Sequence, residues 1–232
     1  ASPETYEPTP SQMRQVANSE LYINVGLIDF EANLTKAVRK NMPDVGIVRL
    51  ADGIPLIEGE CHHDHGEEAG HAHHDGIDPH IWSSPKSLKI MAGTLYQALA
   101  DRYPDSIKYK TNYERLTQRL DSLDQALQGI FADKQTHFMI YHPALTYLAR
   151  DYGLTQISLE SDGKEPSADH IRRLIDSARR WHIPHILYQQ QFSRNTVDAL
   201  SRELDIEAVP IDPLGYDIEN NLLEISRLIA NP

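Results

Sequence analysis

Residues 106–133 have the sequence SIKYKTNYERLTQRLDSLDQALQGIFAD, which carries one continuous helical pattern. Apolar and aromatic side chains recur every three or four positions with charged residues between them. They are Tyr109, Tyr113, Leu116, Leu120, Leu123, Leu127 and Ile130. At 1.5 Å per residue the helix would be roughly 40 Å long, more than one small lobe requires. An ordinary surface helix has the same pattern, but the length and the central place in the chain favour a rigid connection between two lobes.

After this helix the sequence alternates between strand and helix patterns. Strands are predicted at 137–141, 155–159, 183–188 and 207–211, and helices at 145–152, 168–180, 194–204 and 222–230. Such alternation is typical of a parallel sheet covered by helices on both faces.

Before the long helix the elements are shorter. Thr9 is a predicted helix cap with Pro10 at the first helical position. Strands are predicted at 21–25 and 45–50, and helices at 31–39 and from Ser84 to before Pro104. We therefore predict an α/β fold with an N-terminal lobe at 1–104, a linker helix at 105–134 and a C-terminal lobe at 135–232.

Composition excludes several classes of protein. The chain has 34 acidic against 22 basic residues, which argues against nucleic acid and anionic membrane surfaces as partners. Cys61 is the single cysteine, which excludes an intramolecular disulfide and a cysteine-rich zinc module. No apolar run approaches the roughly 20 residues of a membrane-spanning helix. There is also no signal peptide, so one was either removed or never present.

A histidine-rich segment, residues 60–76, interrupts the first predicted lobe. It lacks periodic apolar residues and contains several glycines, so we expect a mobile loop that does not join a core. Imidazoles and carboxylates suit divalent transition metals. We expect weak accessory metal contacts from His62, His63, His65, His71, His73 and His74.

A tighter site is expected where predicted strands end. His142 and Asp212 each follow a strand of the second half directly, and each precedes a proline. Ligands of open parallel sheets collect at the carboxyl ends of strands. In the first half, His80 follows Pro79 in a similar turn. Each residue has a simpler interpretation: a single turn histidine is more often solvated, and Asp212 could merely cap the turn at Gly215. We interpret His137, His170, His182 and His185 as structural or exposed.

Five motifs occur in order: DPHIWSSP (78–85), HPALTYLARDYGL (142–154), GKEPS (163–167), QFS (191–193) and DPLG (212–215). This ordered set resembles the zinc/manganese class of periplasmic solute-binding proteins of ABC transporters, most closely the zinc-uptake members. The resemblance covers essentially the whole chain. It implies two α/β lobes joined by one long helix, a metal site in the cleft between the lobes, and a histidine-rich acidic loop before the Asp-Pro-His motif.

The resemblance also implies a ligand set of Glu4, His80, His142 and Asp212. The family usually has a histidine in its first motif, and here Ser2-Pro3-Glu4-Thr5-Tyr6-Glu7-Pro8 places Glu4 there. A carboxylate binds zinc at ~2.0–2.2 Å, so the change is chemically tolerable. It shifts relative preference toward manganese or iron, whereas the histidine-rich loop favours Zn²⁺ over Mn²⁺. Asp29 and Glu31 are spare carboxylates, although acids at a helix start are also favoured by the helix dipole.

Two features depart from the family. The chain starts inside the first motif and so lacks the family's first strand and helix, either because the sequence is truncated or because the first lobe is incomplete. In addition, residues 188–192, YQQQF, replace the more usual Glu-Pro-Gln-Phe, a change to which the sequence gives no meaning.

We therefore expect a monomeric, non-enzymatic protein on the periplasmic or extracellular side, with or without a lipid anchor. It would capture zinc and deliver it to an ABC-transporter membrane permease. Alternatives are a manganese or iron receptor, an adhesin of the same family, and a metal buffer that uses the loop alone. A metallo-hydrolase is another, because His71-Ala72-His73-His74-Asp75 matches part of a His-x-His-x-Asp motif, although Gly76 stands where that motif continues with histidine.

Overall fold

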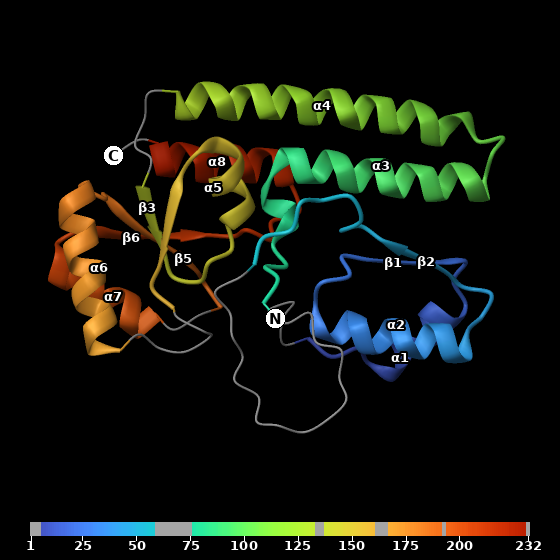
Figure 1. The fold of residues 1–232 in the computed structure, drawn as a ribbon, viewed down its shortest axis with the longest axis horizontal. Helices are drawn as coiled ribbons and strands as arrows, with labels where there is room; N and C mark the ends of the chain where they lie inside the picture. The colour runs from blue at the N-terminus through green and yellow to red at the C-terminus, as the bar shows by residue number, and fades with distance from the viewer. Residues whose placement is uncertain (1–5, 59–75, 133–136, 161–166, 192–193, 231–232) are drawn as a thin grey trace.

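The computed structural model describes residues 6–58, 76–132, 137–160, 167–191 and 194–230. Two sheets lie side by side, one formed before the long central helix and the other after it (Figure 1). We call the part before that helix the N-terminal lobe and the part after it the C-terminal lobe.

The N-terminal lobe is built on a two-stranded parallel sheet. Two helices lie on one side of this sheet and a third lies on the other side (Figure 1). The elements are α1 (Pro10–Ala17), β1 (Leu21–Asn24), α2 (Asp29–Asn41), β2 (Gly46–Arg49), a 3-10 helix (Ile81–Ser83) and α3 (Pro85–Arg102). All of the predicted elements of this lobe are present, with ends shifted by up to two residues.

Side chains fix the starts of the first two helices. Thr9 caps α1 as predicted, because its hydroxyl accepts from the amide of Gln12 while the Gln12 side chain accepts from the Thr9 amide. In the first turn of α2, Glu31 accepts from the amides of Val25 at 3.0 Å and Gly26 at 2.7 Å. Gly26 has φ +82, and the Arg49 side chain occupies the space that a Cβ would need.

The C-terminal lobe is built on a four-stranded sheet in the order β4-β3-β5-β6, and each adjacent pair is parallel. Its elements are β3 (His137–Ile140), α5 (Thr146–Tyr152), β4 (Thr155–Ser158), α6 (Ala168–Trp181), β5 (His185–Gln189), α7 (Arg194–Leu204), β6 (Glu207–Ile211) and α8 (Ile218–Ala230). Helix α8 starts four residues before the prediction, because the Asp217 side chain accepts from the amide of Asn220 and so caps the helix earlier.

Strand β3 shows why this sheet is covered on both faces. Phe138 and Ile140 point into a core shared with α4, α5 and α8, whereas Met139 and Tyr141 point into a second core under α6 and α7. Successive side chains of a strand alternate between faces, so a continuous apolar run requires helices on both sides.

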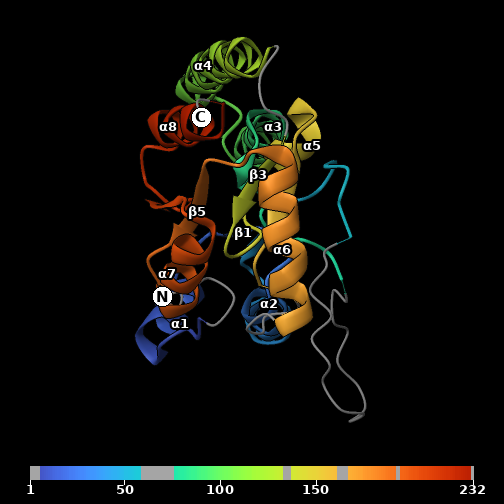
Figure 2. The same ribbon diagram turned by 90° about the vertical axis from the view of Figure 1, so that its left-hand side faces the viewer.

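The long helix α4 (Ile107–Phe131) contacts both lobes, packing along α3 and along α8 (Figure 1). Its buried side chains are Leu120, Leu123 and Leu127. Figure 2 shows α3, α4 and α8 gathered at one end of the molecule, away from α1, α2, α6 and α7. The predicted helix thus runs along both lobes. No helix within the described residues is both long and apolar enough to span a bilayer.

Candidate metal site

The carboxyl edge of the C-terminal sheet carries one polar residue from each strand. Glu160 lies just beyond β4, His142 follows β3 by two residues, Gln189 ends β5 and Asp212 follows β6. In the spatial order of the strands, the edge therefore presents Glu160, His142, Gln189 and Asp212. This is the edge at which open parallel sheets bind ligands.

His80 approaches this edge from the N-terminal lobe in a tight turn. The Asp78 carboxylate accepts from the backbone amide of His80 at 2.8 Å and lies 2.9 Å from His80 Nδ1. The Ser83 amide and hydroxyl both donate to the His80 carbonyl oxygen, at 3.1 and 2.8 Å. An aspartate that bonds to the backbone two residues ahead closes a local turn by itself. The Asp-Pro-His sequence therefore sets both the backbone and the ring of His80.

The two histidines meet across the lobe boundary. His80 Nε2 and His142 Nε2 are 3.3 Å apart, and the residues are only 7% and 5% exposed. His142 Nδ1 lies 2.7 Å from a Glu160 carboxylate oxygen, which matches the pairing of His80 with Asp78. An ionised carboxylate only accepts hydrogen bonds, so each Nδ1 is the donor, and in the neutral ring that metal binding requires, each Nε2 then has its lone pair available. Both rings thus present a metal-binding nitrogen to the same point.

The Asp78 carboxylate stays ionised in this buried place. Burial raises the pKa of Asp78, but the hydrogen bond from the His80 ring, the charge of that ring and the His80 amide together bring the pKa below its ordinary value. An ionised Asp78 can therefore orient His80 near neutral pH.

Gln189 holds the backbone on which His142 stands. Its side-chain amide donates to the His142 carbonyl oxygen at 3.0 Å, and its side-chain oxygen accepts from the His142 amide at 3.4 Å. Gln189 is 1% exposed. The substituted stretch 188–192, which the sequence left without an interpretation, thus contains a residue that fixes a candidate ligand.

Asp212 lies in an exposed turn at the border of the site. Its carboxylate accepts from the amide of Leu214 at 3.1 Å, and its carbonyl oxygen accepts from the amide of Gly215 at 3.0 Å, so it caps the turn. The turn is close to His80, because Trp82 donates to the carbonyl oxygen of Pro213 at 3.2 Å and its ring centroid lies 5.3 Å from that of His80. Ligation by Asp212 stays a prediction.

The other predicted ligands fall into two groups. Glu31 has both carboxylate oxygens bonded to the amides of Val25 and Gly26, which favours its structural interpretation, and Asp29 is exposed. Within the described ranges, no group of three or more histidine, cysteine, aspartate or glutamate side chains could hold a metal. The remaining predicted ligands lie outside the described residues: Glu4, His62, His63, His65, His71, His73 and His74.

Sequence reasoning missed three residues that organise the site, although the sequence carries a signal for two of them. Glu160 directly follows a predicted strand, as Asp212 does, so the rule that selected Asp212 selects it as well. Asp78 stands two residues before His80, which is the spacing of a side-chain turn. Gln189 follows the predicted end of a strand, but a side-chain amide at that position gives no reason to expect hydrogen bonds to the backbone of His142 beyond the neighbouring strand.

A cavity of about 600 Å³ opens beside His80 and Pro143, the residue that follows His142. Leu56, Ile57 and His80 line it from the N-terminal lobe, and Pro143, Thr146 and Arg150 line it from the C-terminal lobe. The candidate site therefore lies at the boundary between the lobes.

Known proteins resemble this chain in sequence, and solved structures resemble it in fold. A crystal structure of ZnuA is 31% identical with a TM-score of 0.86, and covers 100% of this chain and 87% of its own. A zinc-bound ZnuA deletion mutant is 32% identical with a TM-score of 0.85, and covers 99% of this chain and 85% of its own. The zinc-binding lipoprotein AdcA of Streptococcus pneumoniae is 29% identical over 225 residues, which are 91% of this chain and 43% of the relative.

The chain thus spans less than half the length of that streptococcal relative. The family model described as "ZnuA: Zinc-uptake complex component A periplasmic" matches residues 1–227, which is nearly the whole sequence. With the carboxyl-edge site and the two-lobe fold, this match means that the chain belongs to the family of the periplasmic zinc-uptake component A.

Proposed function

We propose that this protein captures a divalent transition metal, zinc in the first place, at the lobe boundary and delivers it to an ABC-transporter permease. The observation that carries the proposal is the 3.3 Å separation of His80 Nε2 and His142 Nε2. Two imidazole nitrogens that each lie about 2.0–2.1 Å from a tetrahedral zinc are about 3.3–3.4 Å apart. The two rings already have the spacing that one zinc ion would impose.

The carboxylates behind the rings support the same proposal. Metal-binding histidines generally donate their second ring nitrogen to a carboxylate or carbonyl, which orients the ring and makes the ligand more basic. Asp78 and Glu160 hold this relation to His80 and His142. The rings are thus oriented before the metal arrives, which favours tight capture.

Glu4 and Asp212 are the proposed remaining ligands. With two imidazoles and two carboxylates the site would be four-coordinate and closed, without the open water position of catalytic zinc sites. A closed site suits capture and release, so we propose a binding protein and no enzymatic activity. The two carboxylates make Mn²⁺ the competing cargo to test.

The remaining features of the proposal come from the family and from related proteins. One relative is named a lipoprotein and the family is described as periplasmic, which supports a place outside the cytoplasm. We further propose a membrane permease as the partner and a monomeric state. The proposed lobe boundaries are 1–104, 105–134 and 135–232. The histidine-rich loop would collect metal weakly and supply it to the tight site.

The test is calorimetric titration of Zn²⁺ and Mn²⁺ into the intact chain and into a variant that lacks residues 61–75. We expect one tight zinc site in both proteins and the loss of only the weak sites with the deletion. A matched control replaces the loop histidines with serine and keeps the loop length, which separates the loss of ligands from a shortened connection.

The metal buffer, the manganese receptor and the hydrolase each predict a different result. Loss of all tight binding with the loop would contradict the lobe-boundary site and favour a metal buffer. Tighter binding of Mn²⁺ than Zn²⁺ would make the cargo manganese. Hydrolysis of ester or lactam substrates that disappears with the loop would favour the hydrolase, whose motif at 71–75 lies outside the described residues.

Replacing Glu160 with glutamine should weaken zinc binding about 10- to 100-fold, the usual cost of losing an outer-shell partner. The amide keeps the shape of the side chain but is a weaker acceptor for His142 Nδ1. Competition with a zinc-binding dye measures the change in affinity.

The matched control for this prediction is Glu219→Gln. It removes the same charge from a carboxylate that pairs with Arg119 at 2.8 Å on α4. We expect its zinc affinity to equal that of the unaltered protein. Equal affinities of both variants would contradict an orienting role for Glu160, whereas equal losses would indicate a general effect of net charge.

A further inference from the structure

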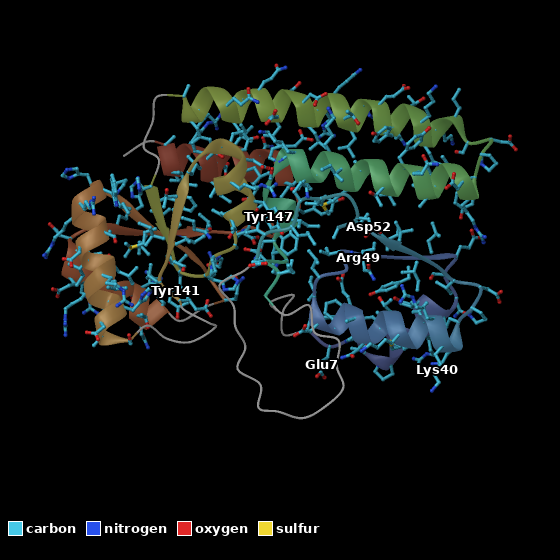
Figure 3. All side chains as sticks on the ribbon, in the orientation of Figure 1. Glu7, Lys40, Arg49, Asp52, Tyr141 and Tyr147 are labelled. Atoms are coloured by element: carbon cyan, nitrogen blue, oxygen red, sulfur yellow. The ribbon has the colours of Figure 1, made fainter. Side chains whose placement is uncertain are left out.

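Tyr147 belongs to the C-terminal lobe by sequence but packs into the N-terminal lobe. It lies in α5, five residues after His142, and is 0% exposed. Its ring joins the cluster of buried apolar side chains Leu27, Ala51, Ile54 and Ile81. Figure 3 shows Tyr147 in the middle of the molecule, where the two lobes meet.

The hydroxyl group of Tyr147 bonds to the segment that leads into His80. It donates to the carbonyl oxygen of Asp78 at 2.8 Å and accepts from the amide of Ile57 at 3.3 Å. Asp78 and Ile57 are themselves joined, because the Asp78 amide donates to the Ile57 carbonyl oxygen at 2.9 Å. One hydroxyl thus bonds to two segments of the N-terminal lobe, at Ile57 and at Asp78, where they pass the candidate site.

Arg150, one turn further along α5, braces the Tyr147 ring. Its guanidinium lies 4.9 Å from the centre of the ring, and it also donates to the carbonyl oxygen of Pro55 in the N-terminal lobe. Asp151 holds the guanidinium in place at 2.8 Å. Arg150 therefore contacts the tyrosine from the same helix and, like the tyrosine, also bonds to the N-terminal lobe.

These contacts form a closed circuit through the candidate site. Tyr147 bonds to Asp78, Asp78 bonds to His80, and His80 lies against His142, which is on the same segment as Tyr147. The Tyr147–Asp78 and His80–His142 contacts both cross the lobe boundary. A shift of the lobes would therefore break the Tyr147–Asp78 bond and separate the two imidazoles in the same movement.

We infer that Tyr147 is a positioning residue for metal capture, whose hydroxyl sets the Asp78–His80 turn so that His80 faces His142. This inference rests on the proposed function. Because the hydroxyl and the metal favour the same arrangement of the lobes, each strengthens the other, as linkage requires. Loss of the hydroxyl releases the turn and speeds the departure of the metal, while the metal strengthens the hydroxyl contacts.

The test compares Tyr147→Phe with Tyr152→Phe in the 232-residue chain. Tyr152 is a matched control, because it lies in the same helix and donates its hydroxyl to Asp124 at 2.6 Å, on α4 and outside the circuit. We expect the zinc dissociation constant of Tyr147→Phe to rise about tenfold or more, as for outer-shell partners, mainly through faster release into a chelator. Tyr152→Phe should stay within about twofold of the unaltered protein.

A double-mutant cycle separates positioning from general packing. If Tyr147 acts through the Asp78 turn, Tyr147→Phe should add little to Asp78→Asn, whereas it should add its full effect to Glu160→Gln, which acts on the other histidine. Full additivity with Asp78→Asn would overturn the inference. So would an unchanged zinc affinity of Tyr147→Phe together with a loss of thermal stability similar to that of Tyr152→Phe.

A measurement on the unaltered protein does not depend on whether the variants fold. Zinc should slow hydrogen exchange of the Ile57 amide, which donates to the Tyr147 hydroxyl. Tight zinc binding without any change at Ile57 would overturn the inference alone. Absence of zinc binding by the unaltered chain would overturn the proposed function, and the inference with it.

Discussion

His80→Ala and His142→Ala are each expected to weaken zinc binding by more than about a hundredfold, since loss of an outer-shell partner alone costs 10- to 100-fold. Each substitution removes one of two imidazole nitrogens that lie 3.3 Å apart in a buried site. Calorimetry with Zn²⁺ measures the loss directly. Thermal unfolding gives a second readout, because a ligand that binds only the folded state stabilises that state. At a free zinc concentration one hundred times the dissociation constant, the gain is about 2.7 kcal/mol.

The control for both substitutions is His182→Asn. His182 is an exposed histidine of the C-terminal lobe with φ +49, a backbone region that asparagine also tolerates. We expect it to keep the zinc affinity and the zinc-induced rise in melting temperature of the unaltered chain. If His80→Ala and His142→Ala both kept tight zinc binding, the lobe-boundary site would be wrong and the loop would become the main candidate.

Leu127→Ala is expected to lower the free energy of unfolding by about 2–5 kcal/mol, the usual cost of truncating a buried leucine. Leu127 is 0% exposed and packs from α4 into the core that also contains Phe138, Leu148 and Leu222. Because this helix contacts both lobes, the cavity would loosen its attachment to the C-terminal lobe. Urea unfolding followed by circular dichroism measures the change.

Leu116→Ala provides the matched control on the same helix. Leu116 is 38% exposed, and truncating it should cost about 1 kcal/mol or less, since less apolar area leaves water there on folding. Similar losses in the free energy of unfolding for both variants would show that burial of the apolar stripe does not attach α4 to the C-terminal lobe. The sequence alone assigned both leucines to that stripe, and the structure separates them by burial.

The arrangement has a consequence for how metal would leave. Interlobe contacts at Asp78, Pro55 and Pro213 involve side chains of the opposite lobe, namely Tyr147, Arg150 and Trp82. A long helix that packs on both lobes restrains large hinge motions. We therefore propose that release depends on a partner that pulls these contacts apart, a role for the permease proposed above.

Local pattern in the sequence determined most of the fold. The period of apolar residues in α4, the alternation of strands and helices after it, and the Thr9 cap depend on residues close together in the chain, so their structure follows from sequence neighbours. The same reasoning placed His80 and His142 in turns, because Pro79 precedes His80 and Pro143 follows His142, and a proline restricts the backbone around it. The apolar pattern indicates the start of α8 only at Leu222, whereas the Asp217 cap starts the helix at Ile218.

Tertiary structure decided which of these residues act together. His80 and His142 are 62 positions apart, and no local pattern fixes the 3.3 Å between their ring nitrogens. Glu160 reaches His142 only because β4 lies beside β3, and Glu31 is turned to backbone amides by the path of the chain after β1. Side-chain partners across a sheet or a lobe boundary depend on strand order and packing, which are properties of the whole fold and not of any single segment.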